Sequence, residues 1–384
     1  INPSVVRPLL DRGLRQFFGE WQWPRPPAVR MSIRGAARNP RTWTGEGSIA
    51  TQRARFRGVW MNRATANVRF ADQAITFNDL HVTRDEGTGT AGSFTYDFGK
   101  REIRLANVQT HLRPSDVIYW IESKFAKVLA PYKFHGVPNV TANGVVQFKG
   151  GKNTRLEIGI DAPDGMDYEL LGKTLELPRV NGRLLFTDDR LQVLHAEGPL
   201  LDGNLKFAAD ISLAKGDSHY SASIAADKVD FPKLTKLYFN FDTARGELSG
   251  TYDFKARGSD ARTMEGAGKV RIADGTVFSI PVFGPLSTLM SSIIPGSGHS
   301  VQREASASFT VRDGVINTND FTVSGRSFGL RGHGDLHFIE NRLDFDIRVD
   351  PRKGPGVVLT PVYELFEYKG DGPLSKPNWH PKRF

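Results

Sequence analysis

The chain has 384 residues, a formal net charge of +9 and no cysteine. Hydrophobic residues make up 39% and charged residues 24% of the sequence, a composition that is typical of a folded chain and excludes a wholly disordered one. The lack of cysteine excludes disulfides and thiol chemistry, and it is compatible with an oxidising compartment.

The positive charge is concentrated in residues 1–70, which contain thirteen Arg, no Lys and three acidic residues. Such a segment could contact anionic lipid head groups or nucleic acid, or it could form solvated strand faces. No nucleic-acid-binding module or aromatic platform motif is recognisable, so we expect no nucleic-acid partner. The chain begins without Met or a signal peptide, and we therefore expect a targeting segment upstream of it.

Two helices and two hairpins are predicted in the first third of the chain. An amphipathic helix over 3–19 carries an apolar stripe that ends in Phe17 and Phe18. Strands follow, with Asp72-Gln73 and Gly99-Lys100 as turns. The second helix begins at Pro114 and ends before Pro131.

Short strands dominate the central third, interrupted by a third helix over 231–239. The dipeptides Asn143-Gly144, Asn181-Gly182 and Asp202-Gly203 are predicted to be turns. The predicted strands are 140–148, 155–160, 183–187, 191–197, 204–213, 220–225 and 247–256.

The region 264–350 has the clearest alternation of apolar and polar residues. Asp274-Gly275 and Asp313-Gly314 are predicted as two-residue hairpin turns. The uncharged run between Gly275 and Gln302 is interrupted by prolines, so no membrane-spanning helix is predicted. After Pro351 we expect a helical turn over 362–368 and an otherwise irregular tail.

The apolar insert 280–294 is expected either to plug the end of the sheet or to contact lipid. Its candidate membrane or lipid contacts are Val282, Phe283, Leu286, Leu289, Met290 and Ile293.

These patterns predict a mainly β fold with three or four short helices, organised as a long, curled, antiparallel-rich sheet. Open sheets of more than about ten strands normally curl, split or close, and a curled sheet with one dry face forms a taco-like groove. We expect three segments: 1–113 with the Arg-rich helix and first strands, 114–263 as the central groove, and 264–384 as the C-terminal segment with the insert and tail.

Motifs that could indicate an enzyme or a metal site are weak. Gly87 to Gly92 matches G-x-G-x-x-G, but a strand rather than a helix follows, so we interpret it as a glycine-rich hairpin loop. His333 and His337 share a strand face with Asp335, yet ordinary polar alternation explains them as well. We predict no catalytic residues, no metal, no cofactor and no enzymatic activity.

The C-terminal segment resembles the AsmA-like family of Gram-negative bacteria. The resemblance covers about 264–377 and rests on the stretches GAGKVRIADGTVFSIPVFGPLSTLMSSI, FTVRDGVINTNDFTVSG, LRGHGDLHFIENRLDFDIRV and FEYKGDGPLSKPNW. The upstream stretch FRGVWMNRATANVRFADQAITFNDLHV is also similar to such proteins. The resemblance implies an inner-membrane anchor, a periplasmic taco-shaped sheet, and a role in moving phospholipid or maintaining the envelope.

We therefore expect the periplasmic part of a bridge-like lipid-transport protein, anchored to the inner membrane through a segment missing from this chain. It would carry phospholipid acyl chains along an apolar β-groove between inner and outer membrane. The expected lining residues are Leu205, Phe207, Ile211, Tyr252, Phe254, Val270, Ile272, Phe309, Val311, Leu336, Phe338, Phe345 and Ile347.

The alternative is a non-catalytic structural or assembly scaffold of the outer envelope, acting through β-edges or surface protein contacts. The expected partners are phospholipid, a membrane surface and, for the scaffold, an envelope protein.

Overall fold

The computed structural model describes residues 12–36, 42–121, 129–148, 152–170, 172–214, 216, 218–240, 244–275, 282–286, 302–325, 328–351 and 367–382. The fold is mainly β, as expected. Twenty-one strands belong to an antiparallel sheet, and three form a small second sheet. The chain forms two compact units, Ile1–Ala196 (unit 1) and Glu197–Phe384 (unit 2). The segment boundaries that we predicted at 113/114 and 263/264 lie inside these units.

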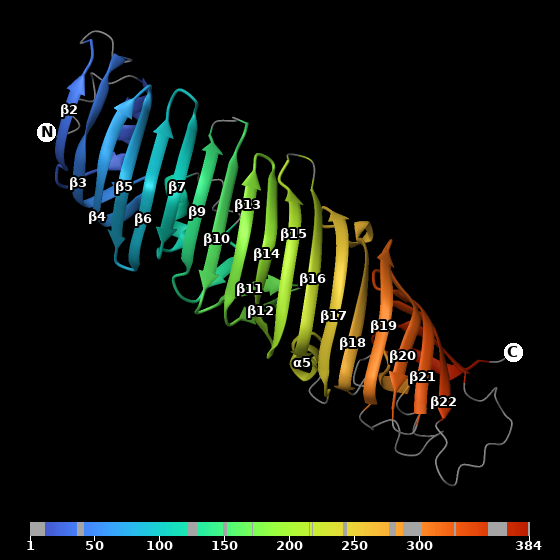
Figure 1. The fold of residues 1–384 in the computed structure, drawn as a ribbon. Coiled ribbons are helices and arrows are strands. Elements are labelled where there is room, and N and C mark those ends of the chain that lie inside the picture. Colours follow the sequence, from blue (N-terminus) through green and yellow to red (C-terminus); the bar gives the residue numbers. More distant parts are fainter. Residues whose placement is uncertain are drawn as a thin grey trace. The chain divides into compact units, whose positions relative to one another are not determined.

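Unit 1 is an antiparallel ladder in chain order, from β2 to β13, with β1 paired to the far end of β3 (Figure 1). Its ladder strands are β1 (Trp21–Gln22), β2 (Ala28–Arg34), β3 (Thr44–Phe56), β4 (Val59–Ala71), β5 (Ala74–Arg84), β6 (Gly87–Asp97), β7 (Glu102–Thr110), β9 (Asn139–Gln147), β10 (Arg155–Ala162) and β13 (Val180–Thr187). The small sheet contains β8 (Tyr132–Phe134), β11 (Met166–Leu170) and β12 (Lys173–Leu177). The strand β14 (Arg190–Leu200) spans the boundary between the units.

Unit 2 is also an antiparallel ladder in chain order, from β15 to β24. Its strands are β15 (Gly203–Ser212), β16 (His219–Asp230), β17 (Glu247–Arg257), β18 (Glu265–Gly275), β19 (Gln302–Arg312), β20 (Val315–Ser324), β21 (Phe328–His337), β22 (Arg342–Pro351), β23 (Glu367–Pro373) and β24 (Asn378–Pro381). A 3₁₀ turn, η4 (Ala261–Thr263), precedes β18.

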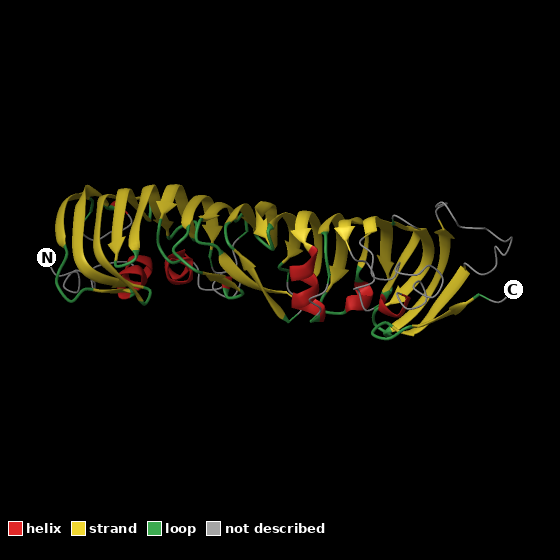
Figure 2. Cartoon of the chain, turned by 90° about the horizontal axis from the view of Figure 1, so that it is seen from below, coloured by secondary structure: helices red, strands yellow, loops and turns green. Residues whose placement is uncertain are grey.

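The helices of the described residues are short. In unit 1, α2 (Arg12–Gly19) and α3 (Pro114–Ile121) confirm parts of the two predicted helices, and residues 1–11 and 122–128 lie outside the described residues. Figure 2 shows the strands of unit 1 bending along their length, with helices on the inner side of the bend. In unit 2, α5 (Phe231–Phe239) has the predicted bounds, because the side chain of Asp230 accepts a hydrogen bond from Lys233 N at 2.7 Å and caps the helix. None of the helices in the described part of the chain is long and apolar enough to cross a membrane.

Several predicted turns are confirmed. Asp72 and Gln73 have φ of 50° and 59°, and Asp313 and Gly314 have φ of 51° and 78°. Both central residues of a two-residue type I′ hairpin turn need positive φ, which Asp and Gly tolerate better than most residues. The predicted turn Asp202-Gly203 lies one residue earlier than expected, since the residues with positive φ are Leu201 and Asp202.

Other predicted turns are wrong. Asn143-Gly144 lies inside β9 and Asn181-Gly182 lies inside β13. Gly144 serves a close approach between strands, because a Cβ there would collide with the carbonyl oxygen of Arg155. Asp274-Gly275 is not a two-residue turn either, because Gly275 pairs with Gln302 and both Asp274 and Gly275 belong to β18.

The tail is not irregular. β23 and β24 form an antiparallel pair in which Gly370 lies opposite Trp379, and a Cβ on Gly370 would lie 2.7 Å from the indole ring. The tail therefore gains its order from an indole packed over a glycine, which strand propensity does not indicate. Tyr368, predicted in a helical turn, lies in β23, and residues 352–366 lie outside the described residues.

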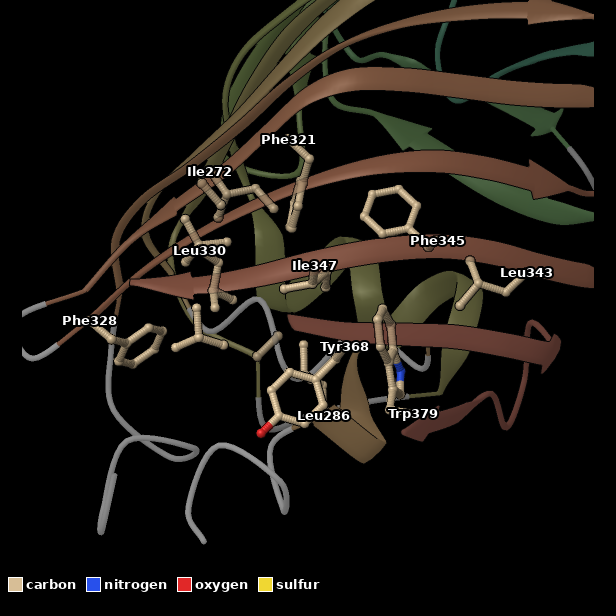
Figure 3. Close-up of a cluster of buried hydrophobic side chains, with 14 of the residues drawn as sticks. Ile272, Leu286, Phe321, Phe328, Leu330, Leu343, Phe345, Ile347, Tyr368 and Trp379 are labelled. Carbon is tan, nitrogen blue, oxygen red and sulfur yellow. The ribbon is translucent and has the colours of Figure 1, made fainter. Parts of the chain in front are cut away.

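The core of unit 2 includes the first turn of the apolar insert (Figure 3). Leu286 is 0% exposed, Phe283 stacks on Phe321 with ring centroids 4.9 Å apart, and the indole of Trp379 donates to Val282 O at 3.2 Å. These contacts agree with the plug interpretation for Val282, Phe283 and Leu286. The positions of Leu289, Met290 and Ile293 lie outside the described residues.

Leu286→Ala should lower the free energy of unfolding of unit 2 by about 2–5 kcal/mol, because it removes a fully buried side chain and leaves a cavity. Urea denaturation followed by circular dichroism measures this change. Leu213→Ala is the control, since Leu213 is 40% exposed and its loss should cost less than about 1 kcal/mol. Equal effects of the two substitutions would show that the insert does not belong to the core.

Candidate functional site

The apolar residues that we predicted in unit 2 share one face of the sheet, except Phe338, which lies in the turn after β21. Register places Phe207 opposite Ile224, Ile224 opposite Tyr252, Tyr252 opposite Gly268, and Gly268 opposite Phe309. This row therefore crosses five adjacent strands on a single face, because residues directly opposite each other in a ladder point the same way.

Burial divides the predicted lining residues into two groups. Ile272, Val311, Phe345 and Ile347 are between 1% and 6% exposed, and three of them belong to the closed core of Figure 3. The other members are only half-buried: Leu205, Phe207, Ile211, Tyr252, Phe254, Val270, Phe309, Leu336 and Phe338. The apolar face is thus covered by the chain itself around β22 and at Ile272 and Val311, and it is left partly open around the aromatic residues of β15 to β19.

Aromatic rings cover the open part of this face. Tyr252 stacks on Phe254 with centroids 4.9 Å apart and lies 5.5 Å from the ring of Phe309. The hydroxyl of Tyr252 is buried and has no hydrogen-bond partner among the described residues. Burial raises the pKa of the Tyr252 phenol, and the neighbouring Tyr220 adds to the effect, so this face remains uncharged at neutral pH.

Unit 1 contains a cavity of about 400 Å³ on the inner face of its sheet. Its walls come from α2, β1, α3 and strands β2 to β6, and its volume lies in the range of roughly 300–1,000 Å³ that is typical of small-molecule sites. None of the described residues that line it is charged, and they include Phe17, Phe18, Trp21, Trp23, Trp43, Phe56, Met61, Val68, Phe77, Val82, Phe94 and Trp120.

Phe17 anchors α2 in this cavity. Its side chain is 3% exposed, and its ring lies 5.2–6.3 Å from six other aromatic rings. Those rings come from α2 itself, β1, β3, β5, β6 and the turn after β6, so a single side chain joins the helix to most of the neighbouring wall.

Two arginines hold α3 against the same face. Arg57 donates to Trp120 O and Ile121 O at 3.1 and 2.8 Å, and to Glu20 Oε2 at 2.7 Å. At the other end of α3, Arg84 Nη2 lies 2.6 Å from Asp116 Oδ2. Arg57 thus satisfies two backbone carbonyls of α3, and Asp116 in the first turn complements the helix dipole, so these contacts fix α3 over the cavity.

The sequence interpretation missed the cavity residues of unit 1, since every expected lining residue lay in unit 2. The apolar stripe of the first helix was recognised, but its role in a cavity was not. Positive φ at Arg53 and Asp79, and a register shift between β4 and β5, disturb the simple alternation of these strands. The spacing of Ala64, Ala66 and Val68, which are all buried, was the available signal.

The weak motifs have structural roles. Gly87 to Gly92 lies in β6, so the hairpin-loop interpretation is wrong and the dinucleotide interpretation also lacks its helix. His333 is 61% exposed with Asp346 at 3.7 Å, while His337 lies 3.9 Å from Glu340. No group of metal-binding side chains occurs among the described residues.

Searches against protein-family models, curated proteins and solved structures found no match to this chain.

Arg57→Ala should release the part of α3 that contains Trp120 and Ile121 and lower the free energy of unfolding of unit 1 by about 2 kcal/mol, because charge-assisted hydrogen bonds are lost. Hydrogen–deuterium exchange should rise over 114–121. Arg53→Ala is the matched control, because Arg53 has a similar φ of 48° against 45° for Arg57 and only stacks on the exposed Trp60. Unchanged hydrogen–deuterium exchange over 114–121 in the Arg57 variant would contradict the conclusion that Arg57 holds α3 in place.

Proposed function

We propose that this chain binds lipid acyl chains on the apolar inner faces of its sheet, as the groove-forming part of a bacterial lipid-transport protein. The observation that carries the proposal is the cavity of unit 1, whose lining is apolar apart from a few hydroxyl and indole groups. The half-buried aromatic face of unit 2 supports it independently.

The energetics favour acyl chains as the occupant. Each CH₂ that leaves water contributes about 0.8 kcal/mol, so exposing a phospholipid with roughly 30 tail carbons costs on the order of 20 kcal/mol. An apolar face that accepts the tails removes most of this cost without any chemical step. Because acyl chains lack hydrogen-bonding groups, the face itself should discriminate little between chain types.

The envelope setting is part of the same proposal. The resemblance of 264–377 to AsmA-like proteins supports a periplasmic location, an inner-membrane anchor outside this chain, and transport of phospholipid towards the outer membrane. The Arg-rich strands of residues 1–70 suit contact with anionic head groups.

Native mass spectrometry of the chain purified from a Gram-negative host tests the proposal. We expect co-purified phospholipid at a defined stoichiometry after detergent is exchanged away. A stably folded, lipid-free chain that also fails to take up phospholipid from vesicles would contradict it and favour the scaffold alternative.

Phe309→Asp should reduce lipid uptake about tenfold or more while the fold survives, because it places a carboxylate in the half-buried apolar row. Lipid transfer from labelled vesicles measures the loss. Thr310→Asp is the matched control on the opposite, exposed face of β19 and should behave as the unmodified chain. Phe345→Asp is unsuitable, because Phe345 is 1% exposed and its replacement should unfold unit 2. Equal uptake by the Phe309 and Thr310 variants would place lipid elsewhere.

A further inference from the structure

Four polar atoms around the cavity of unit 1 are buried and have no hydrogen-bond partner among the described residues. They are the indole Nε1 atoms of Trp21, Trp23 and Trp120 and the hydroxyl Oγ1 of Thr51. All four residues line the cavity, and Thr51 is only 4% exposed. They come from β1, the segment after it, α3 and β3, so the fold gathers them from separate elements.

Such a concentration is unusual for a folded chain. Buried polar groups are almost always hydrogen-bonded, and each unsatisfied one costs about 1–3 kcal/mol. The described residues contain seven side-chain atoms of this kind, and four of them surround this one cavity. Their shared location indicates a ligand group that the cavity is built to receive.

The chemistry of the four atoms restricts that group. An indole N–H is a donor only and a hydroxyl can donate, so the complementary group is an acceptor. None of the described lining residues is a Lys or Arg that could neutralise an anion, and burying an unpaired charge there would be very costly. A neutral carbonyl oxygen therefore fits the site better than a phosphate.

We propose that this cavity binds the ester region of an acyl lipid, with the ester carbonyl oxygens accepting hydrogen bonds from these indole and hydroxyl groups. This inference rests on the proposed lipid-binding function. The charged head group stays outside the cavity, and the acyl chain lies along the apolar lining. The ring of Trp21 packs against side chains, since it stacks on Trp23 and Phe56 with ring centroids 5.4 and 4.5 Å apart. The proposal requires such side chains to turn so that a carbonyl oxygen reaches the buried donors.

Entry is possible at the edge of the sheet. The cavity extends to β2, whose only partner among the described strands is β3, and there Val29 and Ile33 are 44% and 59% exposed. These apolar side chains lie next to the solvent and offer a chain its first contact.

Two ligands that differ only in the acceptor test the inference: a chain-brominated hexadecanoic acid methyl ester and the matching brominated alkyl ether. Bromine quenches indole fluorescence, and four of the six tryptophans line this cavity, so quenching reports binding there directly. We expect the unmodified chain to bind the ester about tenfold more tightly than the ether, since the ether oxygen is the poorer acceptor.

Trp21→Phe, Trp120→Phe and Thr51→Val each remove a donor and keep most of the volume, so each should narrow the ester preference while ether binding changes little. Trp43→Phe is the matched control, because Trp43 lines the same cavity but its Nε1 already donates to Ala36 O at 2.9 Å. Circular dichroism establishes that each variant is folded.

The possible outcomes separate the two proposals. Equal binding of ester and ether by the unmodified chain would overturn the carbonyl site and leave lipid binding intact. A loss of ester preference in the Trp43 variant as large as in the others would also overturn it. If neither the ester nor the ether binds, and the chain takes up no phospholipid in the vesicle assay, the proposed function itself is overturned.

Discussion

An antiparallel sheet with one apolar face must have that face covered, and this requirement governs the structure. Period-two alternation gives the strands one apolar side. Leaving that side in contact with water costs about 25 cal/mol of free energy per Å² of apolar surface. Helices are too few and too short to cover it in the described residues. Whatever lies on this face therefore decides how much of the apolar surface stays in contact with water.

The two units meet the requirement differently. Towards its C-terminal strands, unit 2 covers the face with its own chain: Leu286 and Phe283 from the insert and Trp379 from the tail pack onto it. Over β15 to β19 the aromatic residues stay half-buried. Unit 1 places α2 and α3 on the face, but a cavity of about 400 Å³ remains beneath them. Closed core and open face thus coexist in the described residues, which supports the proposed binding of an apolar ligand.

The sequence was sufficient to predict the class of the fold, since alternation and Asp-Gly or Asp-Gln turns are local signals. The third helix was predicted at its exact bounds because Asp230 caps it and Pro232 follows within its first turn. The prediction of a turn at Asn143-Gly144 was wrong for the opposite reason. Gly144 allows the close approach of Arg155 on the neighbouring strand, which no local pattern reveals. The prediction of an irregular tail was wrong because the order of the tail depends on Trp379 packing over Gly370.

The candidate site was less accessible to sequence interpretation. Alternation identified the shared face in unit 2 but could not separate Phe345, which is sealed in a core, from Phe309, which is half-buried. That distinction depends on the insert and tail, which are remote in the chain. In unit 1, β-bulges interrupt the alternation, and the orphan donors of Trp21 and Trp120 become apparent only when the elements are assembled.

Photo-crosslinking from a phospholipid with a diazirine in its acyl chain, followed by peptide mapping, tests most directly whether the apolar faces hold lipid. We predict adducts on inward-facing residues such as Phe207, Tyr252 and Phe309, and on the cavity wall of unit 1. Adducts confined to outward-facing residues such as Thr310, or spread without regard to the face of the sheet, would contradict it.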